Sequence, residues 1–172
     1  SGNKIFIDEE INLLAKNVLE DNKSIKVLNL SRNSMGNEGI QQYCVFFYRD
    51  FKLTELNLEF NNIGSAGASS ICHGIANCRT IQKLRLRGNH LGASGVRALK
   101  DFLYTNDIIE DIDLSDNKIG AKGAEILGEC LKQSNNIRRL LLGHNYIKAE
   151  GIGAIMEMFR QSEAPLVMEE LD

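Results

Sequence analysis

The sequence predicts an α/β solenoid in which short strands and helices alternate along the chain. A nine-residue pattern, L-x-x-L-x-L-x-x-N with Ile replacing some leucines, occurs five times, and its copies begin 28 residues apart. Its middle apolar residues alternate, which is the period of a strand. The rest of each repeat places apolar residues at steps of three and four, which is the period of a helix. The copies begin at residues 25, 53, 81, 109 and 137.

The segment before the first copy matches the helical half of a repeat. Within residues 3–24, Ile11, Leu14 and Val18 fall at helical spacing. Asp8 precedes them and is a favourable N-cap residue, because its carboxylate accepts hydrogen bonds from free amide groups of the first turn. We therefore expect a helix here, which serves as a half-repeat or cap.

The second half of each full repeat reads L-G-x-x-G followed by apolar residues one, four and eight positions after the second Gly. In the third repeat these residues are Val96, Leu99 and Leu103, after Gly95. Strands joined by such helices are parallel. Residues 3–172 therefore form a single repeat domain. We place its full repeats at residues 25–52, 53–80, 81–108, 109–136 and 137–167.

The end of the chain departs from the strict interval. The segment Met168-Glu-Glu-Leu171-Asp172 resembles residues 109–113, so residues 168–172 are expected to begin a further strand. The fifth repeat would then span 31 residues rather than 28. We expect the chain to be part of a longer solenoid, and the alternative is a natural end with an irregular cap. Residues 1–2 look like a remnant of cloning.

The repeated pattern resembles the leucine-rich repeat, and its 28-residue length with L-G-x-x-G resembles the ribonuclease-inhibitor type. The resemblance covers residues 25–160 and implies a right-handed, curved solenoid with parallel strands on the concave face and helices on the convex face. The spacing agrees, because strands lie about 4.8 Å apart and helices about 8–10 Å apart. Such a stack curves toward its strands.

Composition limits the possible functions. The net charge of −3 does not favour a nucleic-acid binder, and no apolar run reaches the length of a membrane span. The four cysteines lack CxxC spacing and the three histidines lack metal-ligand spacing, so we expect no metal and no cofactor. Free thiols and the absence of a signal segment favour a cytoplasmic protein. An exposed last strand is compatible with a monomer or with weak self-association through its edge.

Five asparagines recur where each strand pattern ends. Their amides can satisfy backbone groups of neighbouring turns, and the resemblance implies the same structural role. A ligand-binding role is the less favoured alternative. They are Asn33, Asn61, Asn89, Asn117 and Asn145.

Residues between and beside the buried leucines point away from the core and form the inner face. From the second repeat onward these positions alternate between acidic and basic, with four acids and four bases. Lateral pairs of this kind contribute a few tenths of a kcal/mol each. Phe60 either anchors a partner or packs against a neighbouring loop. The candidate partner-binding residues are Glu55, Asn57, Glu59, Phe60, Lys83, Arg85, Arg87, Asp111, Asp113, Arg139, Leu141 and His144.

No arrangement of nucleophile, base or paired carboxylates suggests an enzyme. The resembling family includes ribonuclease inhibitors, innate-immune sensors, actin-filament cappers and activators of the GTPase Ran. The favoured hypothesis is a non-catalytic protein-interaction module or scaffold that binds a protein partner through the concave strand face. The alternative is a regulator of a small GTPase, similar to the Ran activators, or of another enzyme. A balanced inner face argues against a ribonuclease inhibitor, since basic ribonucleases require an acidic surface.

Overall fold

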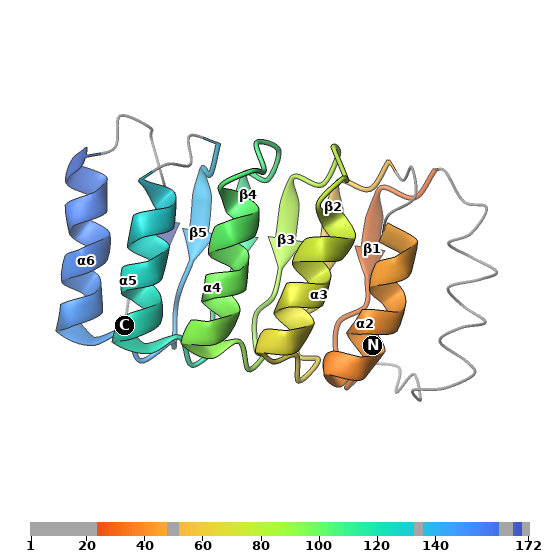
Figure 1. Cartoon of the computed structure of the whole chain (residues 1–172), viewed down its shortest axis with the longest axis horizontal. Coiled ribbons are helices and arrows are strands. Elements are labelled where there is room, and N and C mark those ends of the chain that lie inside the picture. Colours follow the sequence, from red (N-terminus) through yellow and green to blue (C-terminus); the bar gives the residue numbers. More distant parts are fainter. Residues whose placement is uncertain (1–23, 48–51, 133–135, 162–166, 170–172) are drawn as a thin grey trace.

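The computed structural model describes residues 24–47, 52–132, 136–161 and 167–169. Strands and helices alternate through this part of the chain (Figure 1). The helix predicted within residues 3–24 lies before the first described strand, outside the described residues. The described elements are β1 (Val27–Asn29), α2 (Gly36–Phe47), β2 (Glu55–Asn57), α3 (Ser65–Ile75), β3 (Lys83–Arg85), α4 (Gly92–Leu103), β4 (Asp111–Asp113), α5 (Gly120–Leu131), β5 (Arg139–Leu141), α6 (Lys148–Gln161) and β6 (Val167–Glu169).

The six described strands form one parallel sheet whose order follows the sequence, from β1 to β6. Leu28, Leu56, Leu84, Ile112 and Leu140 pair in one lateral row, so each strand advances by one repeat. The five described helices stand side by side in a second layer, in front of the strands in Figure 1. The predicted α/β solenoid with a parallel sheet is confirmed.

The sixth strand lies in a different register from the one predicted. Leu140 pairs with Met168, so the 28-residue interval is kept and a 31-residue fifth repeat is wrong. The predicted register gave the place of Met168 to Leu171, which is outside the described residues. Helix α6 has 14 residues where α5 has 12, and the segment after α6 is shorter by the same amount. Backbone pairing with β5 therefore holds the sixth strand in register.

The core lies between the sheet and the helix layer. Leu56, Leu58, Leu84 and Leu86 are fully buried, whereas the residues between them face away from the helices. Helices contribute residues at steps of three, such as Val96 and Leu99 in α4. Because each repeat packs only against its neighbours, this core is continuous along the described repeats.

Four of the five described helices begin with a residue in the left-handed conformation, whereas Gly64, at the equivalent position before α3, has a φ of −96°. Gly36, Gly92 and Gly120 have φ angles of 61°, 56° and 67° at the first position of their helices. Lys148 replaces this glycine in the last full repeat and still adopts a φ of 59°. A side chain in this conformation costs about 1–2 kcal/mol. The turn therefore keeps its path despite an unfavourable residue.

All four cysteines are free and buried. Burial raises the pKa of the Cys44, Cys72 and Cys130 thiols to about 12. These side chains lie at the packed surfaces of helices α2, α3 and α5. None of the described helices is long and apolar enough to cross a membrane.

Candidate interaction surface on the strands

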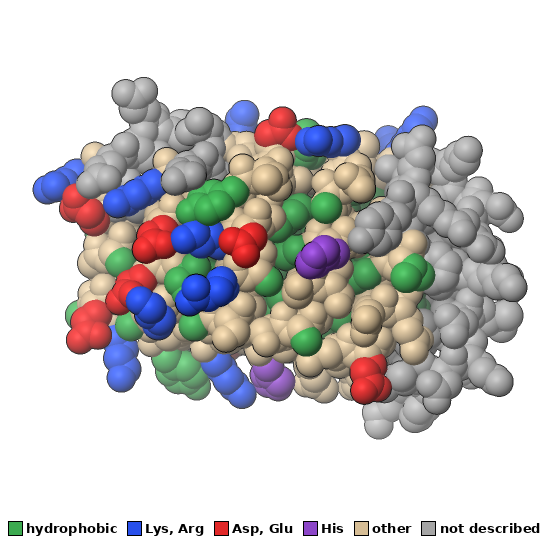
Figure 2. Space-filling view, in the orientation of Figure 1, with side chains coloured by type: hydrophobic (Ala, Val, Ile, Leu, Met, Phe, Trp, Pro, Cys, Tyr) green, Lys and Arg blue, Asp and Glu red, His purple; other side chains and the backbone are tan. Residues whose placement is uncertain are grey.

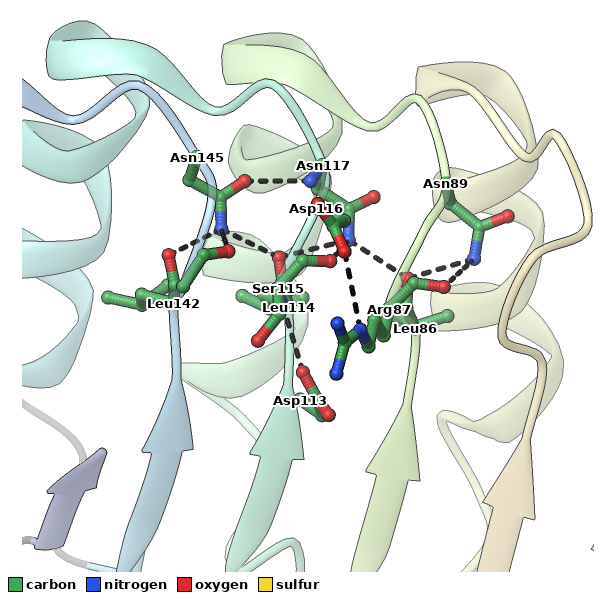
Figure 3. A network of polar contacts seen from close by, with 11 residues as sticks. Leu86, Arg87, Asn89, Asp113, Leu114, Ser115, Asp116, Asn117, Leu142 and Asn145 are labelled. Atoms are coloured by element: carbon green, nitrogen blue, oxygen red, sulfur yellow. Dashed lines mark hydrogen bonds and ion pairs between the residues drawn. The ribbon is translucent and has the colours of Figure 1, made fainter. Parts of the chain in front are cut away.

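The asparagines that follow the strands connect neighbouring turns. The side-chain oxygen of Asn89 accepts hydrogen bonds from the backbone N–H groups of Asn61 and Ile63 at 3.1 and 2.9 Å. Its nitrogen donates to the backbone oxygens of Leu58 and Leu86 at 3.0 and 2.8 Å. Figure 3 shows how the next two asparagines of the series continue this network. The asparagines are buried, so they support the turns rather than face a ligand.

The strands bring the predicted charged residues into two lateral rows. Glu55, Lys83, Asp111 and Arg139 are partners in successive strand pairs. The second row consists of Asn57, Arg85, Asp113 and Leu141. Each strand is only three residues long, so two residues per strand flank the buried middle one and point to the face opposite the helices.

The strongest ion pair on this face is diagonal. Arg85 donates from its two terminal nitrogens to the two carboxylate oxygens of Asp111 at 2.5 and 2.6 Å. Their side chains are only 13% and 14% exposed. The hydrogen bond to Asp111 raises the pKa of the Arg85 guanidinium. This pair is therefore more than the weak exposed contact that the sequence suggested.

The other pairs on this face are longer and more exposed. Lys83 lies 4.0 Å from Glu55, and Arg139 lies 3.8 Å from Asp111. Arg87 donates from Nε to Asp116 at 3.3 Å, a contact drawn in Figure 3. Such exposed pairs contribute about 0–1 kcal/mol.

The acids and bases of this face lie at different depths. The side chains of Lys83, Arg87 and Arg139 are 50%, 43% and 40% exposed. Asp113 is buried, and its carboxylate accepts a hydrogen bond from the backbone N–H of Ser115 at 2.9 Å. Short aspartate side chains stay near the strand, whereas the long stems of Lys and Arg carry their charges outward. Asp111 and Asp113 are therefore less exposed than Lys83, Arg87 and Arg139, whereas Asp116, the partner of Arg87, is 37% exposed.

Phe60 packs against the neighbouring turn. A Cβ atom on Gly88 would lie 2.2 Å from Cδ1 of the Phe60 ring, so only glycine fits beneath it. The guanidinium carbon of Arg32 lies 4.3 Å from the centroid of the Phe60 ring and makes a cation–π contact with it. Both residues have positive φ angles, as have Asp116 and His144 at the equivalent positions. Phe60 is thus half-buried, while His144 is exposed at the same edge of the sheet.

The remaining candidates are spread along the strands. Asn57 turns its side-chain oxygen back to the backbone N–H of Glu59 at 3.0 Å, and both residues are half-buried, as is Leu141. The partner-binding residues predicted from the sequence did not include Asp116, the partner of Arg87. Asp116 lies 56 residues after Phe60, so it occupies the equivalent position two repeats later. The predicted residues also omitted Tyr146, whose side chain is highly exposed.

The helix face has a different character. Figure 2 shows charged side chains gathered over α4 to α6 and few over α2 and α3. Shallow grooves of about 310 and 490 Å³ lie on either side of α3, and Ser69 and His73 line both. Among the described residues no cluster of three His, Cys, Asp or Glu side chains has the arrangement of a metal site.

We expect the Arg85–Asp111 pair to stabilise the fold by about 1–2 kcal/mol, because it is bidentate and largely removed from water. The measurement is a double-mutant cycle with Arg85→Ala and Asp111→Ala in urea denaturation. The control is the equivalent cycle on Arg79 and Asp107, whose side chains are 67% and 78% exposed. The control cycle should give a coupling below about 0.5 kcal/mol. Equal couplings in the two cycles would contradict this account.

Comparisons with known proteins agree with the architecture. A structure described as the actin-binding site 2 of leiomodin-1 superposes with a TM-score of 0.74 at 16% identity, over 88% of each chain. A tropomodulin C-terminal domain from Caenorhabditis elegans superposes with a TM-score of 0.69 at 13% identity, over 89% of this chain and 93% of that one. At these identities the likeness shows the fold alone. No curated protein matches the sequence.

The family comparison matches more than half of the chain. The leucine rich repeat model matches residues 21–41, 50–72, 77–100 and 106–128. These segments contain the first four strands with the turns and helix starts that follow them. The leucine-rich repeat pattern accounts for the 28-residue interval, the strand register and the buried asparagines. The chain belongs to the leucine-rich repeat family.

Proposed function

We propose that this chain is a non-catalytic protein-interaction module that binds a protein partner through the strand face, the expected concave side of the solenoid. One observation supports the proposal most directly. All described helices pack on one side of the sheet, and the opposite side presents exposed charged side chains from successive strands. Extended surfaces of this kind in solenoids accommodate partner proteins. The free buried thiols favour a cytoplasmic location.

Actin is the first partner to test. The superposed leiomodin-1 domain is described as an actin-binding site, and it matches this fold over most of both chains. The fold likeness supports the choice of probe, whereas the binding residues of this chain must be found by substitution. No feature of the described surface favours the small-GTPase alternative over a plain binding module.

The test compares three proteins in co-sedimentation with actin filaments and in affinity capture from cell lysate. They are wild type, a strand-face variant and a helix-face variant. The strand-face variant carries Lys83→Glu, Arg87→Glu and Arg139→Glu. The helix-face variant carries Arg97→Glu, Lys122→Glu and Lys132→Glu, which changes the net charge equally at exposed helix positions. Circular dichroism verifies that both variants fold.

We expect the strand-face variant alone to lose the protein that wild type retains. Loss in the helix-face variant alone would overturn the proposed surface. Failure of wild type to retain any protein in either assay would contradict the interaction-module proposal itself. Retention of lysate proteins without actin would leave the module proposal standing and exclude actin as the partner.

A further inference from the structure

We propose that residues 3–23 dock as a half-repeat on the first described turn and on helix α2, and that Asn33 is the main polar contact between the two. The segment that docks lies outside the described residues, whereas the surface that receives it lies within them. The sequence alone predicts a helix in this segment, and the structure adds the groups to which it binds. Docking does not depend on which partner the strand face binds.

The side-chain oxygen of Asn33 differs from those of the later asparagines in the series. The oxygen of Asn61 accepts hydrogen bonds from the backbone N–H groups of Asn33 and Met35 at 3.0 and 3.4 Å. Each later asparagine accepts in the same way from the turn before it. Asn33 is 6% exposed, and its oxygen has no hydrogen-bond partner in the described part of the chain. Because buried amide oxygens are normally bonded, Asn33 requires donors from a preceding turn.

Helix α2 is also incompletely covered by the described elements. It packs against α3 on one side, and no described helix packs on its other side, where α2 ends the helix row in Figure 1. Two buried polar atoms of α2, Oε1 of Gln42 and the hydroxyl of Tyr43, have no partner among the described residues. Each repeat of a solenoid packs against a neighbour on both sides. The free side of α2 is therefore the place for a further helix.

Residues 3–23 carry the apolar spacing that this place requires. Four of their apolar residues reproduce the spacing of four buried core residues at a constant interval of 29. The four are Phe6, Ile11, Leu14 and Val18. Their counterparts in the first described repeat are Met35, Ile40, Tyr43 and Phe47. The same interval makes the backbone N–H groups of Lys4 and Phe6 equivalent to those of Asn33 and Met35, so these two groups are the donors for the Asn33 oxygen.

The half-repeat has no strand, so it leaves the edge of β1 open. Ile25 and Leu28 are only partly buried, whereas Leu53 and Leu56 at the equivalent positions of the next repeat are buried. Docking of residues 3–23 therefore completes the first turn and the helix layer, and it does not extend the sheet.

Hydrogen exchange of backbone amides, followed by NMR on the full chain, tests the docking. Wild type is compared with three variants. The first carries Asn33→Ala. The second, the stripe variant, carries Ile11→Ser and Leu14→Ser. The matched control carries Asn12→Ser and Lys16→Ser, at positions equivalent to the exposed Gln41 and Val45.

We expect the amides of Lys4 and Phe6 in wild type to exchange at least about tenfold more slowly than in an unstructured peptide, at any protein concentration. Asn33→Ala and the stripe variant should remove this protection, and the control should keep it. The amides of Leu84 and Leu114, in the middle of the described repeats, should stay protected in all four proteins.

Fast exchange of Lys4 and Phe6 in wild type, or protection that survives Asn33→Ala, would overturn the inference. Protection that rises with protein concentration would also overturn it, because a second molecule would then cover this end. If Asn33→Ala removes the protection of Leu84 and Leu114 as well, the stripe variant decides. Its loss of protection at Lys4 and Phe6 alone supports docking, and unchanged protection there contradicts it.

Discussion

Asn89→Ala is expected to lower the free energy of unfolding by about 3 kcal/mol, because it leaves several buried backbone groups without hydrogen-bond partners. The side-chain amide of Asn89 joins two neighbouring turns, since it bonds the backbones of residues 58, 61 and 63 in the second repeat and of residue 86 in the third. Its side chain is 1% exposed, so water reaches these groups only if the turn opens. Urea denaturation followed by circular dichroism measures the change.

The matched control for this substitution is Asn57→Ala. Asn57 lies on strand β2, where its oxygen accepts one bond from the backbone N–H of Glu59 in a partly exposed position. Its removal should cost no more than about 1 kcal/mol. A similar loss for both variants would show that the buried asparagine network does not hold the turns together.

The periodic part of the structure was accessible from the sequence. Every repeat shows the strand period around two leucines, such as Leu56 and Leu58, and the helical period after its glycines. The two patterns agree in five copies, so the order of strands and their parallel pairing follow directly. The lateral order of Glu55, Lys83, Asp111 and Arg139 also follows, because a constant interval places equivalent residues side by side.

The register of the sixth strand could not be predicted from the sequence, because it depended on one local match rather than on repeated copies. The segment after Pro165 fits two registers, and only pairing between β5 and β6 selects the one with Met168 beside Leu140. No later described copy of the repeat follows β6, so the register assigned to this strand cannot be checked against a further copy. The length of α6 also differs from that of α5, so helix boundaries gave no independent check.

The electrostatic character of the strand face could not be predicted from the sequence for a different reason. A repeat pattern assigns residues to a face but gives neither the depth of a side chain nor its partner. Arg85 contacts Asp111 diagonally, although its lateral neighbour in the sheet is Asp113. The count of four acids and four bases is therefore correct as a composition, but it does not give the exposure or the partner of each charged side chain.

Alkaline pH is expected to destabilise the protein through its buried thiols. The ordinary pKa of a cysteine is 9.0, and burial raises the pKa of Cys44, Cys72 and Cys130 to about 12. The unfolded chain therefore ionises its thiols first. For groups with a raised folded-state pKa, the stabilising contribution is complete below the unfolded pKa and is lost as the pH rises from about 9 toward 12.

The size of this effect follows from the number of thiols. Each contributes up to about 1.4 kcal/mol per pH unit in this window, so three thiols lower the free energy of unfolding by about 4 kcal/mol between about pH 8 and pH 10. Urea denaturation at a series of pH values, with a reductant present, measures the slope. Tyr43, whose pKa burial also raises to about 12, adds to the loss only above its ordinary value of 10.0.

The control is a variant with Cys44→Ala, Cys72→Ala and Cys130→Ala, compared by its slope with pH rather than by its absolute stability. Removing the thiols leaves packing changes that are the same at every pH, whereas it removes the protons that the unfolded chain releases. The variant should therefore lose most of the dependence on pH up to about 10. An unchanged slope would contradict the prediction, because it would show that the thiols ionise equally in the folded and unfolded states despite their burial in the folded protein.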